Sequence, residues 1–95
     1  DSYKLLDEVV TILNNYPAYS VSVEGYTDST GSDAINDKLS NERAKVCADY
    51  ILSKEIAADR VSSVGFGSKN PIADNKTAAG RAKNRRTEFN LSIKD

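Results

Sequence analysis

Hydrophobic residues recur along the chain with two different periods, and the period changes near Pro17. From Leu5 to Leu13 the apolar side chains are spaced three or four residues apart, with polar residues between them. This spacing predicts an amphipathic helix that ends before Pro17. At Val21 and Val23 the period becomes two, so a half-buried strand is predicted to follow the helix.

A long helix is predicted from about Asp33 to Lys54, after a stretch rich in turn-forming residues. At about 100° per residue, four of its side chains fall on one narrow stripe, namely Ile35, Leu39, Val46 and Tyr50. We expect this stripe to face the core. Arg43 falls beside the stripe, and Asn36 and Ser40 continue the same edge of the helix.

The last part of the chain predicts two more strands and a short helix. The apolar residues between 61 and 66 are followed by a glycine that ends the pattern, and this favours a strand. Residues 68–80 are typical of an irregular loop. A short basic helix or turn is predicted at about 79–85. Alternating apolar and polar residues at 89–93 predict the final strand.

This order of elements predicts an α/β fold, an α+β sandwich in which helices pack on one face of a small mixed sheet. The strand–helix–strand unit in the middle predicts a right-handed crossover between parallel strands. A chain of 95 residues is expected to form a single domain, residues 1–95. Because three strands behind an opening helix make an incomplete sheet, we expect a further strand upstream of Asp1.

The composition excludes several classes of function. The chain has no His and one Cys, Cys47, which excludes Ser-His-Asp and Cys-His catalysis, His-rich metal sites and internal disulfides. The absence of Met favours a processed or excised piece of a longer protein. The 13 Lys and Arg against 14 Asp and Glu give a net charge of −1, which favours neither nucleic acid nor a membrane surface. We expect no cofactor and no metal.

Two charged residues are candidates for binding a ligand. Asp28 directly follows the strand at 21–25, and open α/β sheets bind ligands beyond the carboxyl ends of their strands. Arg43 lies beside the predicted core stripe, where a guanidinium must reach solvent or an anion. Each has a structural alternative, because Asp28 could hold its own turn and the stem of Arg43 could cover apolar surface. Together they predict a pocket for a ligand with both an ammonium and a carboxylate.

Four cations follow Gly80 within the segment Gly80–Arg86. Basic runs face solvent, contact phosphate or pair with nearby acids. Because no aromatic residues are interleaved with these cations and the net charge is slightly negative, we expect no nucleic-acid partner.

Five segments of the chain carry one further pattern: Val23–Gly31, Asn36–Ala44, Gly65–Gly67, Pro71–Asn75 and Gly80–Glu88. In their residues, order and spacing they resemble the OmpA-like C-terminal domain family, which includes the peptidoglycan-associated lipoprotein and MotB-type flagellar stator proteins. The resemblance covers about residues 5–93. It implies a non-catalytic domain that binds the diaminopimelate of the peptidoglycan stem peptide and anchors the outer membrane or an envelope complex to the cell wall.

The resemblance implies six ligand-binding residues, which are Thr27, Asp28, Asn36, Leu39, Arg43 and Arg86. Asp28 would accept the ammonium of diaminopimelate, and Arg43, fifteen positions later, would grip its carboxylate. Thr27 and Asn36 would add hydrogen bonds. Leu39 would form part of the wall, and Arg86 a second positive charge at the rim.

Other residues of the family pattern are expected to be structural, in the closing turn and its ion pairs: Arg81, Asn84, Arg85 and Glu88. Tyr26 departs from the pattern, because the family most often has His there. The resemblance also implies a periplasmic location, as a domain of an outer-membrane or cell-envelope protein, without membrane insertion by the domain itself. A homodimer is a further option that the sequence leaves open.

Two other functions are alternatives to peptidoglycan binding. The carboxylates Glu24 and Asp28 could serve an enzyme as an acid/base pair, but four residues along a strand place them about 13 Å apart, too far for that work. We therefore expect no enzyme. The alternative that stays open is a structural or protein-interaction domain of the envelope without peptidoglycan binding.

Overall fold

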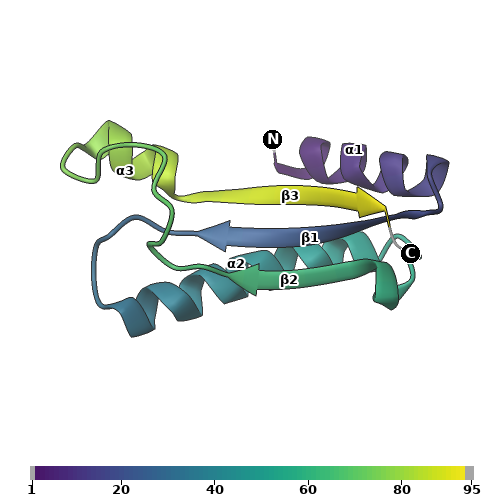
Figure 1. Cartoon of the computed structure of the whole chain (residues 1–95), viewed down its shortest axis with the longest axis horizontal. Helices are drawn as coiled ribbons and strands as arrows, with labels where there is room; N and C mark the ends of the chain where they lie inside the picture. Colours follow the sequence, from purple (N-terminus) through teal and green to yellow (C-terminus); the bar gives the residue numbers. More distant parts are fainter. Residues whose placement is uncertain (1, 94–95) are drawn as a thin grey trace.

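The chain alternates helices with strands, as the hydrophobic pattern predicted (Figure 1). The computed structural model describes residues 2–93. Along the chain the elements are α1 (Ser2–Asn15), β1 (Tyr19–Tyr26), α2 (Asp33–Leu52), a 3-10 turn (Ala58–Arg60), β2 (Val61–Gly65), α3 (Ala78–Asn84) and β3 (Arg86–Ile93). The predicted type and order of every helix and strand are confirmed, with ends shifted by a few residues.

Three strands form one mixed sheet in the order β2-β1-β3. β1 pairs in parallel with β2, with Gly25 opposite Gly65, and this confirms the predicted parallel pair joined through α2. β1 pairs in antiparallel with β3, with Gly25 opposite Thr87. The carboxyl end of β1 therefore lies between the end of β2 and the start of β3, and the turn with Asp28 leaves the sheet there (Figure 1).

The core lies between one face of the sheet and the helices α1 and α2. Alternation along β1 buries Val21 and Val23 completely or nearly so, and both point to that face. They join one apolar cluster with residues of α1 and α2, among them Leu13 and Ile51, which have no exposed surface. This confirms the prediction that the helices pack on one face of a small mixed sheet.

The predicted core stripe of α2 is wrong for three of its four residues, whereas the fourth, Tyr50, is partly buried against the core. Ile35, Leu39 and Val46 are 56%, 40% and 69% exposed. The side chains that α2 buries are mostly small, and they are Asn36, Ser40, Ala44, Ala48 and Ile51. On the helical wheel this face lies about 130° from the stripe that the large apolar residues define.

Close contact between α2 and two glycines explains this choice of face. A Cβ atom on Gly25 would lie 2.2 Å from the backbone oxygen of Ser40, and one on Gly65 would lie 2.3 Å from the backbone nitrogen of Asn41. Because the helix backbone comes this near to the sheet, large aliphatic side chains cannot fit between them. The small residues therefore point inward, and Leu39 and Val46 are left on the outer flank.

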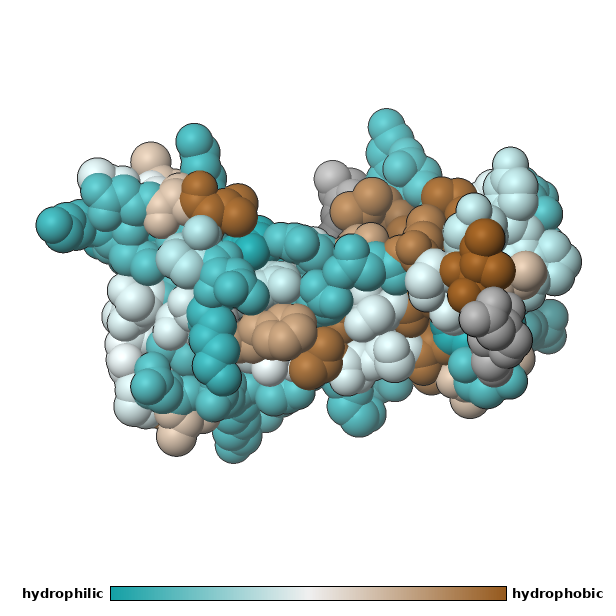
Figure 2. All heavy atoms as spheres, viewed as in Figure 1, coloured by the Kyte–Doolittle hydropathy of each residue, from teal (hydrophilic) through white to brown (hydrophobic). Residues whose placement is uncertain are grey.

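Within residues 2–93 no helix covers the opposite face of the sheet (Figure 1), and this face is mostly hydrophilic (Figure 2). Apolar atoms gather instead over α1 and the carboxyl end of β3 (Figure 2). A groove of about 450 Å³ runs there between the two elements, lined by Leu5, Val9 and Ile12 of α1 and by Phe89 and Leu91 of β3. Within residues 2–93, β3 pairs with β1 alone, so its outer edge borders this groove.

The Arg60 side chain forms hydrogen bonds with both the end of α1 and the start of β1. We expect its removal to destabilise the fold. Its Nε donates to the carbonyl of Tyr19 at 2.9 Å, and its Nη2 donates to those of Leu13 at 2.8 Å and Tyr16 at 3.1 Å. We expect Arg60→Ala to lower the free energy of unfolding by about 2 kcal/mol, because carbonyls at a helix C-terminus lose a charged donor. Urea unfolding measures this, with Lys38→Ala as a control for an exposed cation. Equal midpoints for Arg60→Ala and the control would contradict the role.

Candidate functional site

Asp28 lies in the turn after β1, and its carboxylate is held in place by two donors. The residue is 7% exposed. Its Oδ1 accepts from the backbone N–H of Thr30 at 2.8 Å, and its Oδ2 accepts from Nη1 of Arg85 at 2.6 Å. These contacts, with the Thr30 N–H first and Arg85 second, lower the pKa of Asp28 below its usual value of 3.8. The turn therefore holds a carboxylate that stays ionised at all ordinary pH values.

The lowered pKa predicts how stability depends on pH. An acid whose pKa falls on folding stabilises the protein above the unfolded pKa, near 3.8, and this contribution is lost as the pH falls through the folded pKa. We expect wild type to lose more free energy of unfolding between pH 5 and pH 2.5 than Asp28→Asn does. Urea unfolding at a series of pH values measures the difference. Parallel curves for the two proteins would show that Asp28 has no such linkage.

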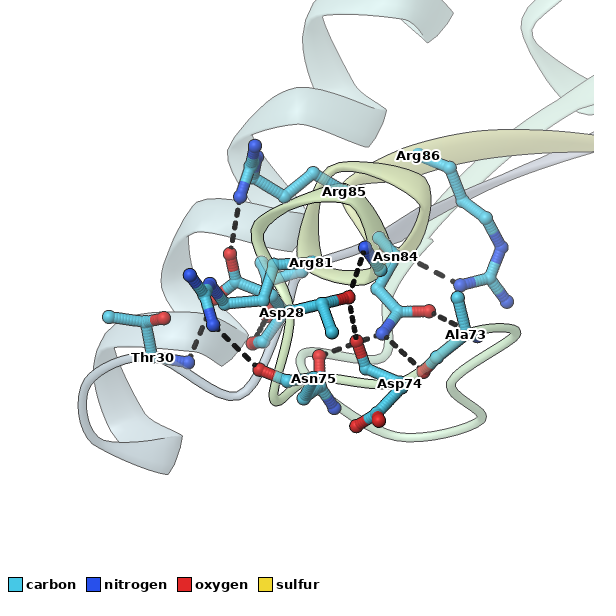
Figure 3. A network of polar contacts seen from close by, with 12 residues as sticks. Asp28, Thr30, Ala73, Asp74, Asn75, Arg81, Asn84, Arg85 and Arg86 are labelled. Carbon is cyan, nitrogen blue, oxygen red and sulfur yellow. Dashed lines mark hydrogen bonds and ion pairs between the residues drawn. The ribbon is translucent and has the colours of Figure 1, made fainter.

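Arg85 is the partner that the sequence did not identify. It follows α3 directly as the C-cap residue, and 57 positions separate it from Asp28. Its side chain is 44% exposed in the ion pair, whereas that of Asp28 is 10% exposed. Figure 3 shows the guanidinium of Arg85 reaching away from the α3 loop to the Asp28 carboxylate. The structural ion pair expected for Arg85 is thus present, and its partner is the predicted ligand-binding carboxylate.

Asn84 fixes the segment that carries Arg85. It has no exposed surface. Its Oδ1 accepts from the backbone N–H groups of Ile72 and Ala73 at 2.8 and 3.0 Å, and its Nδ2 donates to the carbonyl of Ala73 and to Oδ1 of Asn75. Figure 3 shows this amide at the centre of the loop before α3. The loop is therefore an ordered support for the Arg85 position.

Arg86, the residue after Arg85, has other partners and forms no hydrogen bond or ion pair with Asp28 within residues 2–93. Its guanidinium carbon lies 3.9 Å from the ring centroid of Tyr26. Its Nε donates to Oε2 of Glu88 at 2.6 Å, and its Nη2 donates to the carbonyl of Asn70 at 2.9 Å. The cation that contacts Asp28 is Arg85, and the ligand role of Arg86 stays a prediction.

Arg43 and Leu39 lie together on the exposed flank of α2. They line a groove of about 470 Å³ with Val46, Cys47 and Thr87. Within residues 2–93, the guanidinium of Arg43 forms no hydrogen bond or ion pair. Burial raises the pKa of the Cys47 thiol above its usual value of 9.0, so the thiol is protonated at neutral pH. The groove thus combines apolar walls with a free cation.

The register of the sheet brings this groove near the Asp28 turn. Thr87, which lines the groove, lies opposite Gly25 in the sheet. Gly25 precedes Asp28 by three residues, and Thr87 follows Arg85 by two. The groove with Arg43 and the Asp28–Arg85 pair are therefore neighbouring parts of one region, at the carboxyl end of β1.

Thr27 and Asn36 are both buried in this region. The backbone N–H of Thr27 donates to the carbonyl of Gly67 at 2.7 Å, and its hydroxyl donates to the carbonyl of Asp28 at 2.9 Å. Asn36 is 3% exposed, and its Nδ2 has no hydrogen-bond partner within the described residues. A buried donor without a partner costs about 1–3 kcal/mol, so Asn36 is placed to gain from a ligand acceptor.

Within residues 2–93, no group of three or more Cys, Asp or Glu side chains is arranged to hold a metal ion. The described helices also include none that is both long and apolar enough to cross a membrane.

The model of the family described as OmpA matches residues 1–85, which include β1, α2, β2 and α3. The chain belongs to the OmpA family. This confirms the resemblance found in the sequence.

Curated relatives match nearly the whole of this chain. The peptidoglycan-binding protein ArfA of Mycobacterium tuberculosis is 50% identical over 87 residues, which are 92% of this chain and 27% of the relative. Outer membrane porin F of Pseudomonas aeruginosa is 44% identical over 89 residues, covering 93% of this chain and 25% of the porin. The chain thus spans about a quarter of the length of these curated relatives.

Solved structures share the fold closely. The peptidoglycan-associated lipoprotein from Burkholderia pseudomallei superposes with a TM-score of 0.90 at 25% identity, covering 97% of this chain and 79% of that chain. The cell wall anchor of the T6SS from Pseudomonas aeruginosa superposes with a TM-score of 0.81 at 30% identity, covering 98% of this chain and 66% of that one. These likenesses confirm the predicted fold class.

Tyr26, where the OmpA-like pattern most often has His, is built into the sheet in this chain. It is 5% exposed, and its hydroxyl donates to Oε1 of Glu24 at 3.0 Å. Its ring stacks on Phe66 with centroids 5.4 Å apart, and Arg86 covers it. Burial, with the hydrogen bond to Glu24 second, raises the pKa of Tyr26 above 10.0, so it remains neutral. Tyr26 thus serves the packing of the open sheet face.

Proposed function

We propose that this OmpA-family chain binds the stem peptide of peptidoglycan non-covalently, through its diaminopimelate residue. The observation that carries the proposal is a buried, ionised Asp28 carboxylate beside a groove with the unpaired Arg43 guanidinium. The free end of diaminopimelate bears an ammonium and a carboxylate on one carbon. An anion and a cation at neighbouring positions complement such a group.

The proposal gives each of the six predicted ligand-binding residues a role that is compatible with its contacts in the structure. Asp28 receives the ammonium, and the planar fork of Arg43 holds the carboxylate in two places. Asn36 supplies its unpartnered amide donor, and Thr27 fixes the backbone next to Asp28. Leu39 packs on the apolar part of the diaminopimelate chain. Arg86, tied to Glu88, contributes at most a more distant positive charge.

The biological role that follows is anchoring. A domain that holds the stem peptide without cutting it fastens its parent protein to the cell wall, in the periplasm of an envelope with an outer membrane. ArfA is named as a peptidoglycan-binding protein, and the P. aeruginosa structure is described as a cell wall anchor, which supports this role. The competing proposal, an envelope domain that contacts protein alone, has no comparable support in these names.

Two measurements test the proposal. Calorimetric titration with a diaminopimelate-containing muropeptide is expected to show saturable binding. Sedimentation with purified sacculi is expected to remove the chain from solution without release of soluble muropeptides. A chain that stays in the supernatant and gives no heat of binding would contradict the proposed function. Release of fragments would instead indicate an enzyme.

A further inference from the structure

Asp28 and Arg85 form an ion pair within the proposed binding site, and the inference drawn from this pair rests on the proposed function. The two oxygens of Asp28 are already engaged, Oδ1 with the Thr30 N–H and Oδ2 with Arg85 at 2.6 Å. The Asp28 side chain is only 10% exposed, so little of the carboxylate is open to a further donor. An ammonium that approaches Asp28 must therefore take over the position of Arg85 or share it.

Arg85 is the more exposed and less constrained partner of the ion pair. Its side chain is 44% exposed, its backbone caps the end of α3, and the ion pair with Asp28 is its one ion pair within residues 2–93. When a ligand ammonium neutralises Asp28, the guanidinium of Arg85 loses its counter-ion at the edge of the site. The other cation of the region, Arg43, is engaged by the first ligand carboxylate. A second anionic group on the ligand would give Arg85 a new partner.

We infer that Arg85 is a specificity-determining residue, which selects stem peptides with a free carboxylate in addition to the one held by Arg43. Two carboxyl groups of the stem can supply it, the α-carboxyl of the D-glutamate residue and the main-chain carboxyl of diaminopimelate. Conversion of that carboxylate to a carboxamide removes its charge and leaves Arg85 facing a dipole. The site thus favours stem peptides that are not amidated.

The surroundings of Arg85 include other charges that bear on this inference. Glu42 also lines the groove with Arg43 and lowers the positive charge of the region. Arg81, on the same short helix, donates to the carbonyl of Asn75 at 2.9 Å and holds the loop. Within the described residues neither forms a hydrogen bond or ion pair with Asp28, so Arg85 is the cation that a ligand ammonium would replace on that carboxylate.

The experiment compares two ligands on three proteins by calorimetry at low and moderate salt. The ligands are L-alanyl-γ-D-glutamyl-diaminopimelate with both stem carboxyl groups free, and the same tripeptide with both amidated, leaving the carboxylate at the free end of diaminopimelate. Wild type is expected to bind the free form about tenfold more tightly or better, since a charge-assisted contact is lost on amidation. Arg85→Gln is expected to bind both forms with nearly equal affinity.

Lys83→Gln is the matched control, because it removes one exposed cation from the same helix without touching Asp28. It is expected to keep the wild-type preference, which separates a local contact from long-range charge. The chemical-shift dispersion and urea midpoint of Arg85→Gln show whether the fold is intact, and Arg85→Lys, which keeps the charge, should retain part of the preference. Equal binding of both ligands by wild type, or an unchanged preference in Arg85→Gln, overturns the inference alone. Absence of binding for both ligands overturns the proposed function and the inference together.

Discussion

Asp28→Asn and Arg43→Gln are each expected to weaken binding of a diaminopimelate-containing muropeptide by about tenfold to a hundredfold. Each substitution removes one charge-assisted contact, and such contacts contribute about 1.5–3 kcal/mol. Both side chains keep their approximate shape, and the Asn oxygen can still accept from Thr30. The loss should therefore appear in the affinity while the fold survives, and calorimetric titration measures it.

The exposed ion pair on α2 offers matched controls for both substitutions. Lys45 and Asp49 contact each other at 3.0 Å, with side chains 72% and 57% exposed. Lys45→Gln and Asp49→Asn remove the same kinds of charge from the surface of α2, and neither residue lines the groove with Arg43. Both controls should bind like wild type. If Asp28→Asn and Arg43→Gln also bind like wild type, the muropeptide binds elsewhere on the chain.

The periodicity of apolar residues was enough to predict the helices and strands of this fold. The alternation around Val21 and Val23 matches β1, and the three-to-four spacing from Leu5 matches α1, because in each element one face is buried by large aliphatic side chains. The parallel pairing of β1 with β2 also followed from the length of the connection between them, since α2 fills it.

The buried face of α2 could not be found in the same way. Hydrophobicity points to Leu39 and Val46, but the helix lies so close to the sheet that only small side chains fit beneath it. A signal was present in the sequence, namely the row of residues at intervals of four: Asn36, Ser40, Ala44 and Ala48. Its meaning depends on the two glycines of the facing strands, and their partner is visible only once the sheet is formed.

The sequence predicted those site residues whose location follows from a single helix or strand. Asp28 was identified by its place after β1. The structural role that was the alternative for it is compatible with ligand binding, because its Oδ1 accepts the Thr30 N–H within its own turn. Arg85 was missed, since a pair separated by 57 positions is set by the loop that Asn84 organises. Arg85 caps α3 and Arg86 begins β3, and the spacing of these two adjacent arginines to Asp28 does not show which one meets it.

Gly25→Ala is expected to cause a large loss of stability and, with it, a loss of binding. The new Cβ would lie 2.2 Å from the oxygen and 3.0 Å from the carbonyl carbon of Ser40, both of them backbone atoms. No change of rotamer relieves that contact, so α2 has to move away from β1. Overpacking of this kind costs about 3 kcal/mol. For a domain of 95 residues this lowers the melting temperature by more than about 10 °C.

Gly31→Ala is the control that separates the steric effect of an added Cβ on stability from the effect of losing a glycine's backbone freedom. Gly31 has φ +86° and nothing within 4 Å of an added Cβ, so the substitution costs only the strain of a left-handed alanine, about 1 kcal/mol. Thermal unfolding of both variants should rank Gly25→Ala well below Gly31→Ala. The reverse order would contradict the close packing of α2 on β1. Because that packing also positions α2, which carries Asn36 and Arg43, relative to β1 and the Asp28 turn, muropeptide affinity should fall in Gly25→Ala at temperatures where the variant is still folded, and remain unchanged in Gly31→Ala.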